Sequence, residues 1–318
     1  MAKHFILILF FGCGIFTANA QLMQSFVHQG EFGIGAGAAH YFGDLNPTAA
    51  VNRPKANASI FFRKQFNNYM SVRLSGEYAL LGYSDQYSNN ATQLRRNLSF
   101  NSHVWEAAVS FDFNFFTFQP GFEDFRFTPY IGVGVGAFSY DPYAFLGNQK
   151  YFLRPLGTEG QGSSAYPAFK TYAPIAVSVP LTLGVKYALS EQFNVFAELM
   201  YRFTNTDYLD DVSGVYAPDA FPTLPDGSPS PAFLLQDRSY ETGNPIGIKG
   251  RQRGNTLQTD VFAGLKLGFF LQFTNLQVPK ACPISRFGYN KAKYSAQTSV
   301  FSLILQPINP FLKHAGRP

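Results

Sequence analysis

Cysteine, tryptophan and charged residues are all scarce in this 318-residue sequence, which contains two Cys, one Trp and 14% charged residues. One cysteine, Cys13, lies in a leading apolar segment that we expect to be removed. The mature chain would then keep a single thiol, Cys282, which excludes an intramolecular disulfide and therefore a disulfide-stabilised small fold. No run of about twenty apolar residues follows the N-terminus, which excludes a bundle of transmembrane helices.

Aromatic residues and glycine are abundant instead. Aromatic residues make up 17% of the sequence, with 35 Phe and 18 Tyr, and there are 28 Gly. Low charge together with many aromatic residues and glycines is typical of a membrane-embedded β-barrel. The length allows one large β domain with a sizeable interior.

Residues 1–20 have the pattern of an export signal. Lys3 and His4 form a basic head, residues 5–16 are apolar, and Ala18 and Ala20 frame a small-residue cleavage site before Gln21. This order predicts a signal peptide over residues 1–20. Lipidation at Cys13 is the alternative, but the apolar run continues past that residue.

The stretch at residues 103–116 alternates apolar and polar side chains. Trp105, Val109 and Phe111 are separated by polar residues that include Glu106 and Asp112. A period of two predicts a strand with one apolar and one polar face, here a wall between lipid and a polar lumen. Eight such runs occur, at residues 31–41, 56–65, 70–81, 103–116, 127–140, 177–188, 193–203 and 257–273.

The connections between these runs alternate in length. Those at residues 42–55, 82–102, 141–176 and 204–256 are long, and the other three are short. This alternation is typical of outer-membrane barrels, in which long loops face outward and short turns face the periplasm. We therefore expect an all-β protein whose residues 21–273 form an eight-stranded antiparallel transmembrane β-barrel with long extracellular loops.

Residues 274–318 differ from the rest of the chain. This segment has six basic residues and no Asp or Glu, so its net charge is +6. Because the whole chain has a net charge of +5, the other residues together carry about −1. Pro279, Pro283, Pro307 and Pro310 oppose long strands there. We interpret it as a basic periplasmic tail whose partner is an acidic protein or anionic lipid, and we do not expect nucleic-acid binding.

Charged residues at polar positions of the strands are balanced in sign. In a barrel of eight strands the side chains fill the interior, so these residues predict a buried hydrogen-bonded network. A pore or a proton path is the alternative use of the same groups. The predicted lumen residues are Arg63, Arg73, Glu77, Glu106, Asp112, Lys186, Glu198, Arg202, Asp260 and Lys266.

Signals for catalysis, cofactors and metals are weak. The five histidines are scattered, and none has a metal-spaced partner or lies beside a nucleophile elbow. The glycines at 132, 134 and 136 lie inside a strand and precede no helix, so they predict small lumen-facing residues and no phosphate loop. Asp207, Asp210 and Asp211 could bind calcium but lack the spacing of a calcium loop. We predict no enzymatic activity, no cofactor and no metal.

Four short sequence strings resemble a known family. They are Gly43, Asp44 and Leu45 after the first strand; Trp105 and Glu106 in the fourth; Pro155, Leu156, Gly157, Thr158, Glu159 and Gly160 in the third long loop; and Asp207, Tyr208, Asp210 and Asp211 in the fourth. With Cys282, they resemble the PorG-like outer-membrane β-barrel family of the Bacteroidota type IX secretion system. The resemblance runs from about residue 29 to 285, and the tail beyond Cys282 is longer than the family pattern.

The resemblance implies a non-enzymatic component of the type IX protein secretion system in the bacterial outer membrane. Its partners would be outer-membrane lipid, periplasmic ring lipoproteins and other secretion components, and it would link the ring to the membrane. A paralogue could serve another assembly. The alternatives are a surface receptor or adhesin, which would use the long loops, and a small diffusion pore, which would use the lumen.

Overall fold

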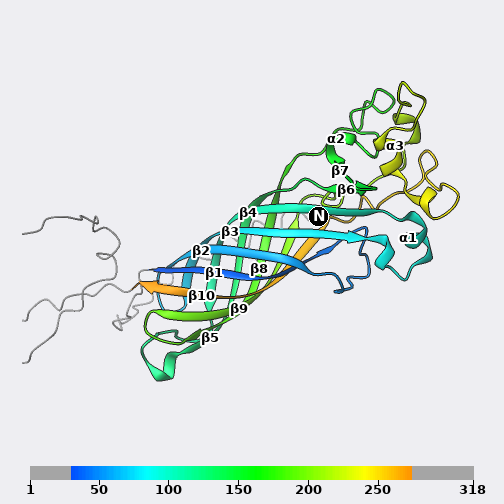
Figure 1. The fold of residues 1–318 in the computed structure, drawn as a ribbon. Coiled ribbons are helices and arrows are strands. Elements are labelled where there is room, and N and C mark those ends of the chain that lie inside the picture. The colour runs from blue at the N-terminus through cyan, green and yellow to red at the C-terminus, as the bar shows by residue number, and fades with distance from the viewer. Residues whose placement is uncertain (1–29, 274–318) are drawn as a thin grey trace, which may run out of the picture. The chain divides into compact units, whose positions relative to one another are not determined.

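The computed structural model describes residues 30–273. Eight long strands form the barrel wall, and a small hairpin and short helices gather where the long loops lie (Figure 1). The predicted signal peptide (residues 1–20), the predicted tail (residues 274–318) and Cys282 lie outside the described residues. The wall strands are β1 (Gly30–Phe42), β2 (Lys55–Gln65), β3 (Met70–Ser84), β4 (Ser99–Asn114), β5 (Phe127–Ser139), β8 (Ile175–Ala188), β9 (Phe193–Thr204) and β10 (Val261–Phe273).

Every wall strand pairs in antiparallel fashion with its neighbours in sequence order. The first and last strands also pair, with Gly30 opposite Phe273, and β3 pairs with β4, so the sheet closes on itself. The expected fold class, an all-β eight-stranded antiparallel barrel, is confirmed. A closed barrel leaves no unpaired sheet edge, which satisfies the backbone hydrogen bonds of a wall in lipid.

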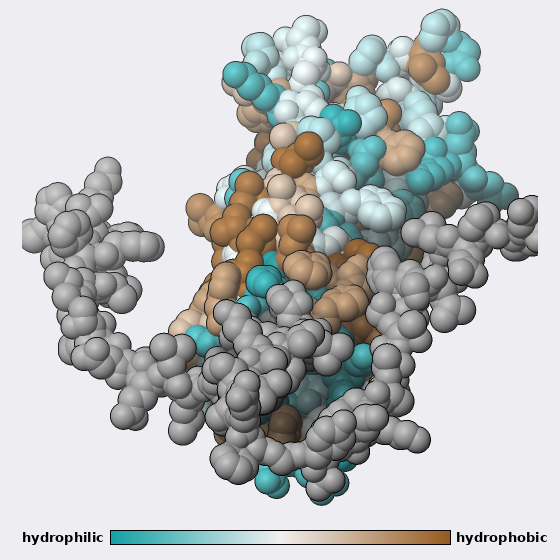
Figure 2. Space-filling model, turned by 90° about the vertical axis from the view of Figure 1, so that its left-hand side faces the viewer, coloured by the Kyte–Doolittle hydropathy of each residue, from teal (hydrophilic) through white to brown (hydrophobic). Residues whose placement is uncertain are grey.

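The period-two pattern accounts for the two faces of the wall. Along β4, Trp105, Val109 and Phe111 are exposed while Glu106 and Asp112 are buried. Apolar side chains gather over the barrel, and paler and hydrophilic ones lie over the loops (Figure 2). Residues Trp105 to Phe115 span ten positions, which at about 3.4 Å each and a tilt of roughly 40° gives an apolar band about 26 Å tall, the thickness of an outer-membrane barrel's band.

The structure adds elements that the sequence patterns did not predict. The third long loop contains a hairpin whose strand β6 pairs with β4 through Tyr143 and Asn101. The last wall strand begins at Val261, four residues later than its predicted start. The added elements are β6 (Tyr143–Leu146), β7 (Gln149–Phe152), α1 (Ala91–Arg96), α2 (Leu153–Leu156), α3 (Pro231–Gln236) and the 3-10 turns Asp85–Tyr87, Glu123–Phe125, Pro218–Ala220 and Ser239–Glu241.

No helix among residues 30–273 has the length and apolar character needed to cross a membrane.

Candidate functional site

The middle of the barrel lumen is filled by ten charged side chains that form one continuous chain of ion pairs. Positive and negative groups alternate along it without interruption. In order, the members of this charge chain are Lys186, Glu31, Arg63, Asp112, Arg73, Glu198, Lys266, Glu77, Arg202 and Glu106. Five cations meet five anions, so the lumen is electrically neutral although it is densely charged.

The first half of the charge chain lies toward the short turns. Glu31 pairs with Arg63 and, at 3.4 Å, with the Lys186 Nζ. The Asp112 carboxylate then joins two arginines, with its Oδ2 2.8 Å from Arg63 Nε and 3.3 Å from Arg73 Nε. All five side chains are almost fully buried. Because each charge has an opposite partner, the cost of removing it from water is offset.

The second half continues from Arg73, whose Nη1 lies 2.7 Å from Glu198 Oε2. Lys266 Nζ lies 3.0 Å from Glu198 Oε1 and also contacts Glu77, which in turn pairs with Arg202. Arg202 Nε lies 2.7 Å from Glu106 Oε2, where the chain ends.

Neutral side chains complete this half of the chain. The Tyr130 hydroxyl donates to Glu198 at 2.6 Å, Asn57 Nδ2 donates to Glu77 at 2.6 Å, and the Ser178 hydroxyl donates to Glu106 at 2.5 Å. These donors occupy carboxylate lone pairs that the cations leave open, so the carboxylates are held by more than ion pairs alone.

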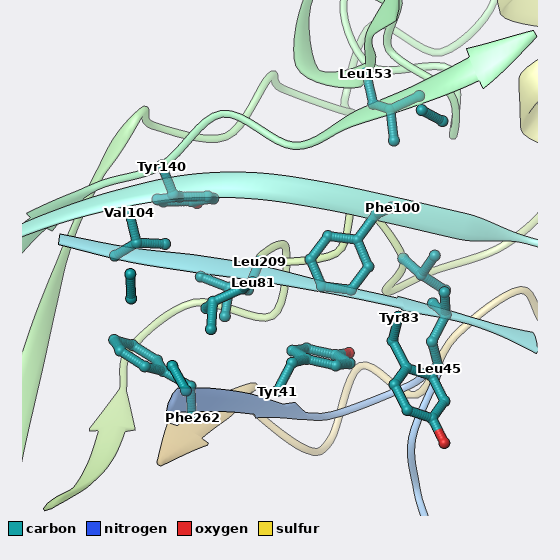
Figure 3. Packing of buried hydrophobic residues seen from close by; sticks show 14 of the residues in the cluster. Tyr41, Leu45, Leu81, Tyr83, Phe100, Val104, Tyr140, Leu153, Leu209 and Phe262 are labelled. Atoms are coloured by element: carbon teal, nitrogen blue, oxygen red, sulfur yellow. The ribbon is translucent and has the colours of Figure 1, made fainter. Parts of the chain in front are cut away.

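Two apolar clusters pack in the lumen beside the charge chain. At the turn end, Phe118 reaches in from the turn after β4, is fully buried, and packs with Phe61, Phe196 and Phe270. At the loop end, side chains from β1, β3, β4 and β10 point toward one another and toward loop residues such as Leu45 and Leu209 (Figure 3). The lumen is thus a packed interior in which aromatic and charged side chains are interleaved toward the turn end: Arg63 lies two residues nearer the end of β2 than Phe61, and Lys186 pairs with Phe196.

The four long loops are tied to one another above the barrel. We call this assembly of residues 43–54, 85–98, 140–174 and 205–260 the loop cap. Arg96 holds three loops together: it forms two 2.8 Å contacts with Asp85 and donates to the carbonyls of Arg253 at 2.7 Å and Asp44 at 3.0 Å. Arg95 adds contacts to Ser239 and Thr242. The cap is therefore one cross-linked structure.

Glu159 and Arg253 join the third and fourth loops inside the cap. The Glu159 carboxylate accepts from the backbone N–H groups of Ser213 and Gly214 at 2.9 Å and lies 3.1 Å from Arg253 Nη1. Thr158 donates to Asp211, and Arg253 Nε donates to the Gln236 carbonyl at 3.0 Å. Gly157, which ends α2, has a φ of +59° that favours glycine and turns the chain into this contact.

The loop cap contains more buried carboxylates than cations. Loss of hydration on burial raises the pKa of Asp207 to about 7, and the neighbouring Asp44 and Glu159 carboxylates add to the rise. Burial likewise raises the pKa of Asp211 to about 6, although Arg253 opposes the shift. Burial and the Asp44 carboxylate raise the pKa of Asp210. The cap therefore holds acids that titrate near neutral pH.

Most of the loop strings singled out in the sequence meet in the loop cap. Asp44 accepts from Asn255 N at 2.9 Å, Leu45 lies in the loop-end cluster, and Asp207 accepts from the Ser213 hydroxyl at 2.5 Å. Pro155 and Leu156 lie in α2, and the Tyr208 hydroxyl donates to Glu159 at 3.3 Å. Trp105 and Glu106 are adjacent on β4 and point to opposite sides of the wall.

Three charged residues in the structure depart from the sequence reasoning. Asp260 lies at the loop end, where it accepts from Tyr41 OH at 3.0 Å and Leu209 N at 2.9 Å, apart from the charge chain. Glu31 takes a place in the chain that the predicted set lacked. Glu31 lies two residues before the inward-facing Gly33, so alternation along the strand places its side chain in the lumen. Arg253 lies in a long loop without periodicity, and no sequence signal identified it.

Among residues 30–273, no three His, Cys, Asp or Glu side chains converge in a way that could hold a metal ion. Asp207, Asp210 and Asp211 each accept hydrogen bonds from protein donors.

Solved structures similar to this chain are small barrels. Neisserial surface protein A shares 12% identity, with 77% of this chain and 97% of that chain covered and a TM-score of 0.37. The attachment invasion locus protein Ail of Yersinia pestis shares 11% (77% and 97% covered, TM-score 0.35), and the outer membrane protein OprG of Pseudomonas aeruginosa shares 12% (78% and 97% covered, TM-score 0.35). The fold assignment depends on the strand pairing of this chain itself.

No curated protein matches the sequence. A family profile described as Domain of unknown function (DUF6089) matches residues 3–220, well over half of the chain, and the chain therefore belongs to that family.

Proposed function

We propose that this protein is a non-enzymatic barrel of the bacterial outer membrane that acts through its surfaces, as a component of the type IX protein secretion system that links the periplasmic ring to the membrane. The observation that carries a surface role is the filled lumen. Ten paired charges and two apolar clusters fill it. A packed interior offers no route for a solute, so a diffusion pore is disfavoured.

The assignment to the secretion system comes from the loop strings. Asp44, Thr158, Glu159 and Asp211 make contacts between loops, and Asp207 contacts Ser213 within the fourth loop. A barrel wall alone requires none of these contacts, so the strings serve the loop cap specifically. A rigid cap on a closed barrel suits an anchoring protein, because partners bind preformed surfaces with less ordering entropy.

The test is an affinity pull-down of the tagged protein from gently solubilised outer membranes, with and without residues 280–318, and identification of partners by mass spectrometry. Ring lipoproteins and secretion components in the full-chain sample, and their loss without the basic tail, are the expected result. Deleting the gene should also stop export of secreted cargo. Normal export in the deletion strain would overturn the secretion role.

A surface receptor or adhesin is the second candidate, and the exposed apolar side chains of the loop cap favour it. Phe233, Tyr240 and Ile248 are exposed on the fourth loop, with Ile248 63% exposed. Changing Ile248 to Asp together with Phe233 to Ser should abolish binding to an external surface and leave export intact. Loss of export with these changes would favour the secretion role instead.

A further inference from the structure

The outer face of the barrel carries a stack of aromatic rings at its loop end. Tyr78 and Trp105 lie opposite each other on β3 and β4, with ring centroids 4.7 Å apart. His103 stacks on Tyr78 at 6.0 Å and on Tyr143 of β6 at 5.6 Å. The Tyr78 hydroxyl also contacts His103 Nδ1 at 2.7 Å. We call these four residues the aromatic ledge. It joins the barrel wall to the β6 and β7 hairpin.

The hairpin presents its apolar face without a cover. Tyr143 is opposite Phe152, and Phe145 is opposite Lys150, so these four side chains share one face. Phe145 is 46% exposed and Phe152 42% exposed. Two exposed phenylalanines on a short hairpin continue the apolar surface of the wall beyond Trp105, which is 62% exposed.

A cation lies within this apolar face. Lys150 Nζ is 3.6 Å from the Tyr143 ring centroid and 4.5 Å from that of Phe152. Within residues 30–273, no Asp or Glu forms an ion pair with Lys150. A second ammonium is close by, because Lys55 donates to Asn101, the residue that pairs with Tyr143. The ledge therefore combines aromatic rings with positive charge that has no carboxylate partner.

The position along the barrel identifies what this surface meets. Trp105 marks the upper limit of the apolar band, as aromatic residues do at a membrane boundary. Asn101 and its partner Tyr143 lie four residues further along β4, which is about 10 Å along the membrane normal at about 3.4 Å per residue and a tilt of roughly 40°. That height is at the outer edge of the headgroup layer, since headgroups add roughly 5–7 Å to each side of the hydrocarbon core.

We propose that the aromatic ledge and the β6 and β7 hairpin bind the phosphate-bearing headgroup of a glycolipid in the outer leaflet. Lys150 contacts the phosphate, and Phe145 and Phe152 pack on the sugar. The long amphipathic Lys side chain suits this depth, because its stem lies on apolar surface while its ammonium reaches polar groups. The inference rests on the outer-membrane location in the proposed function and is independent of secretion.

Native mass spectrometry of the full chain, folded in detergent and titrated with purified lipid A, tests the proposal. The unchanged protein should retain lipid A, and Lys150→Glu should weaken the affinity about tenfold. Phe145→Ser with Phe152→Ser should weaken it as well. The matched control is Lys249→Glu, since Lys249 is exposed in the fourth loop and pairs with Asp219. Heat-dependent migration on detergent gels confirms that each variant is folded.

Three outcomes would overturn the proposal. The first is equal lipid A binding by Lys150→Glu and the unchanged protein. The second is displacement of lipid A by millimolar inorganic phosphate, which would make this a simple anion site. The third is a dimer that is lost with the Phe changes while lipid binding persists, which would assign the face to a second copy. Absence of the protein from isolated outer membranes would instead contradict the location, so the two failures are distinguishable.

Discussion

The lumen and the loop cap both bury charged residues, but the lumen has equal numbers of cations and anions, whereas the cap has more carboxylates than cations. The charge chain sets five cations against five anions, each with an opposite neighbour. In the cap, the carboxylates of Asp85, Glu159, Asp210, Asp211 and Asp260 are buried; Arg96 pairs with Asp85, and Arg253 pairs with Glu159 and Asp211. An acid-rich interior raises the pKa of several acids. We therefore expect the stability of the cap to depend on pH near neutrality.

Breaking the charge chain should have the largest effect. Among residues 30–273, Arg202 is the only cation paired with Glu106 and one of two on Glu77, and Arg202→Met removes it. Because a buried charge left without its partner costs about 3–5 kcal/mol, the barrel should unfold at clearly lower urea concentration in detergent. The measurement is the urea midpoint by tryptophan fluorescence, which Trp105 supplies.

The control for this change is Lys249→Met. Lys249 pairs with Asp219 at 2.6 Å, but both groups are exposed, so the urea midpoint should hardly change. Equal shifts of the urea midpoint in the two variants would contradict the assignment of the charge chain as a structural core.

Arg253→Met should destabilise the loop cap and leave the barrel wall folded. It removes the cation from Glu159 and a donor from the Gln236 carbonyl, so the third and fourth loops should loosen by about 2–3 kcal/mol. Limited proteolysis should then cleave residues 205–260 faster, while the heat-dependent gel shift of the barrel is retained. Loss of the gel shift would show that wall and cap fold as one unit.

The smallest effect concerns pH. Asp207 has its pKa raised from an ordinary 3.8 to about 7. The folded cap binds this proton more tightly than the unfolded loop does, so the stabilising effect is present at low pH and is lost as pH rises through about 7. Cleavage of the cap should be on the order of three- to tenfold slower at pH 5 than at pH 8.

Asp207→Asn should flatten this pH dependence, because the amide does not titrate. Proteolysis rates measured at several pH values on both proteins check the expectation. An unaltered pH profile in the variant would assign the response to Asp210 or Asp211 instead.

The sequence predicted the wall well because alternation along a strand is a strong local signal. All eight strands were found, and their limits differ from the structure by a few residues, most at β4 and β10. The hairpin was missed because β6 and β7 have only four residues each, too few for a period to emerge. Asp260 immediately precedes β10 and accepts from the Tyr41 hydroxyl of β1, so it lies at the loop end of the barrel and outside the charge chain.

The loop cap was the least predictable region. Its strings were noticed by resemblance, yet the contacts of Glu159 with Ser213 and of Asp44 with Asn255 join residues far apart in the chain. No periodicity connects such positions, since loops follow tertiary contacts and not a local repeat. Arg253 illustrates this: its importance comes from partners in two loops, none of which lies in its sequence neighbourhood.

The alternating order of the charge chain sets a rule for how this protein can evolve. Counted in pairs from the Lys186 end, a cation and its following anion can be lost together, and the remaining fragments stay neutral. Arg63 with Asp112 is such a pair. Losing Asp112 with Arg73 instead leaves one fragment with an excess positive charge and the other with an excess negative charge. We therefore expect relatives to lose Arg63 and Asp112 together, and seldom to lose Asp112 and Arg73 together.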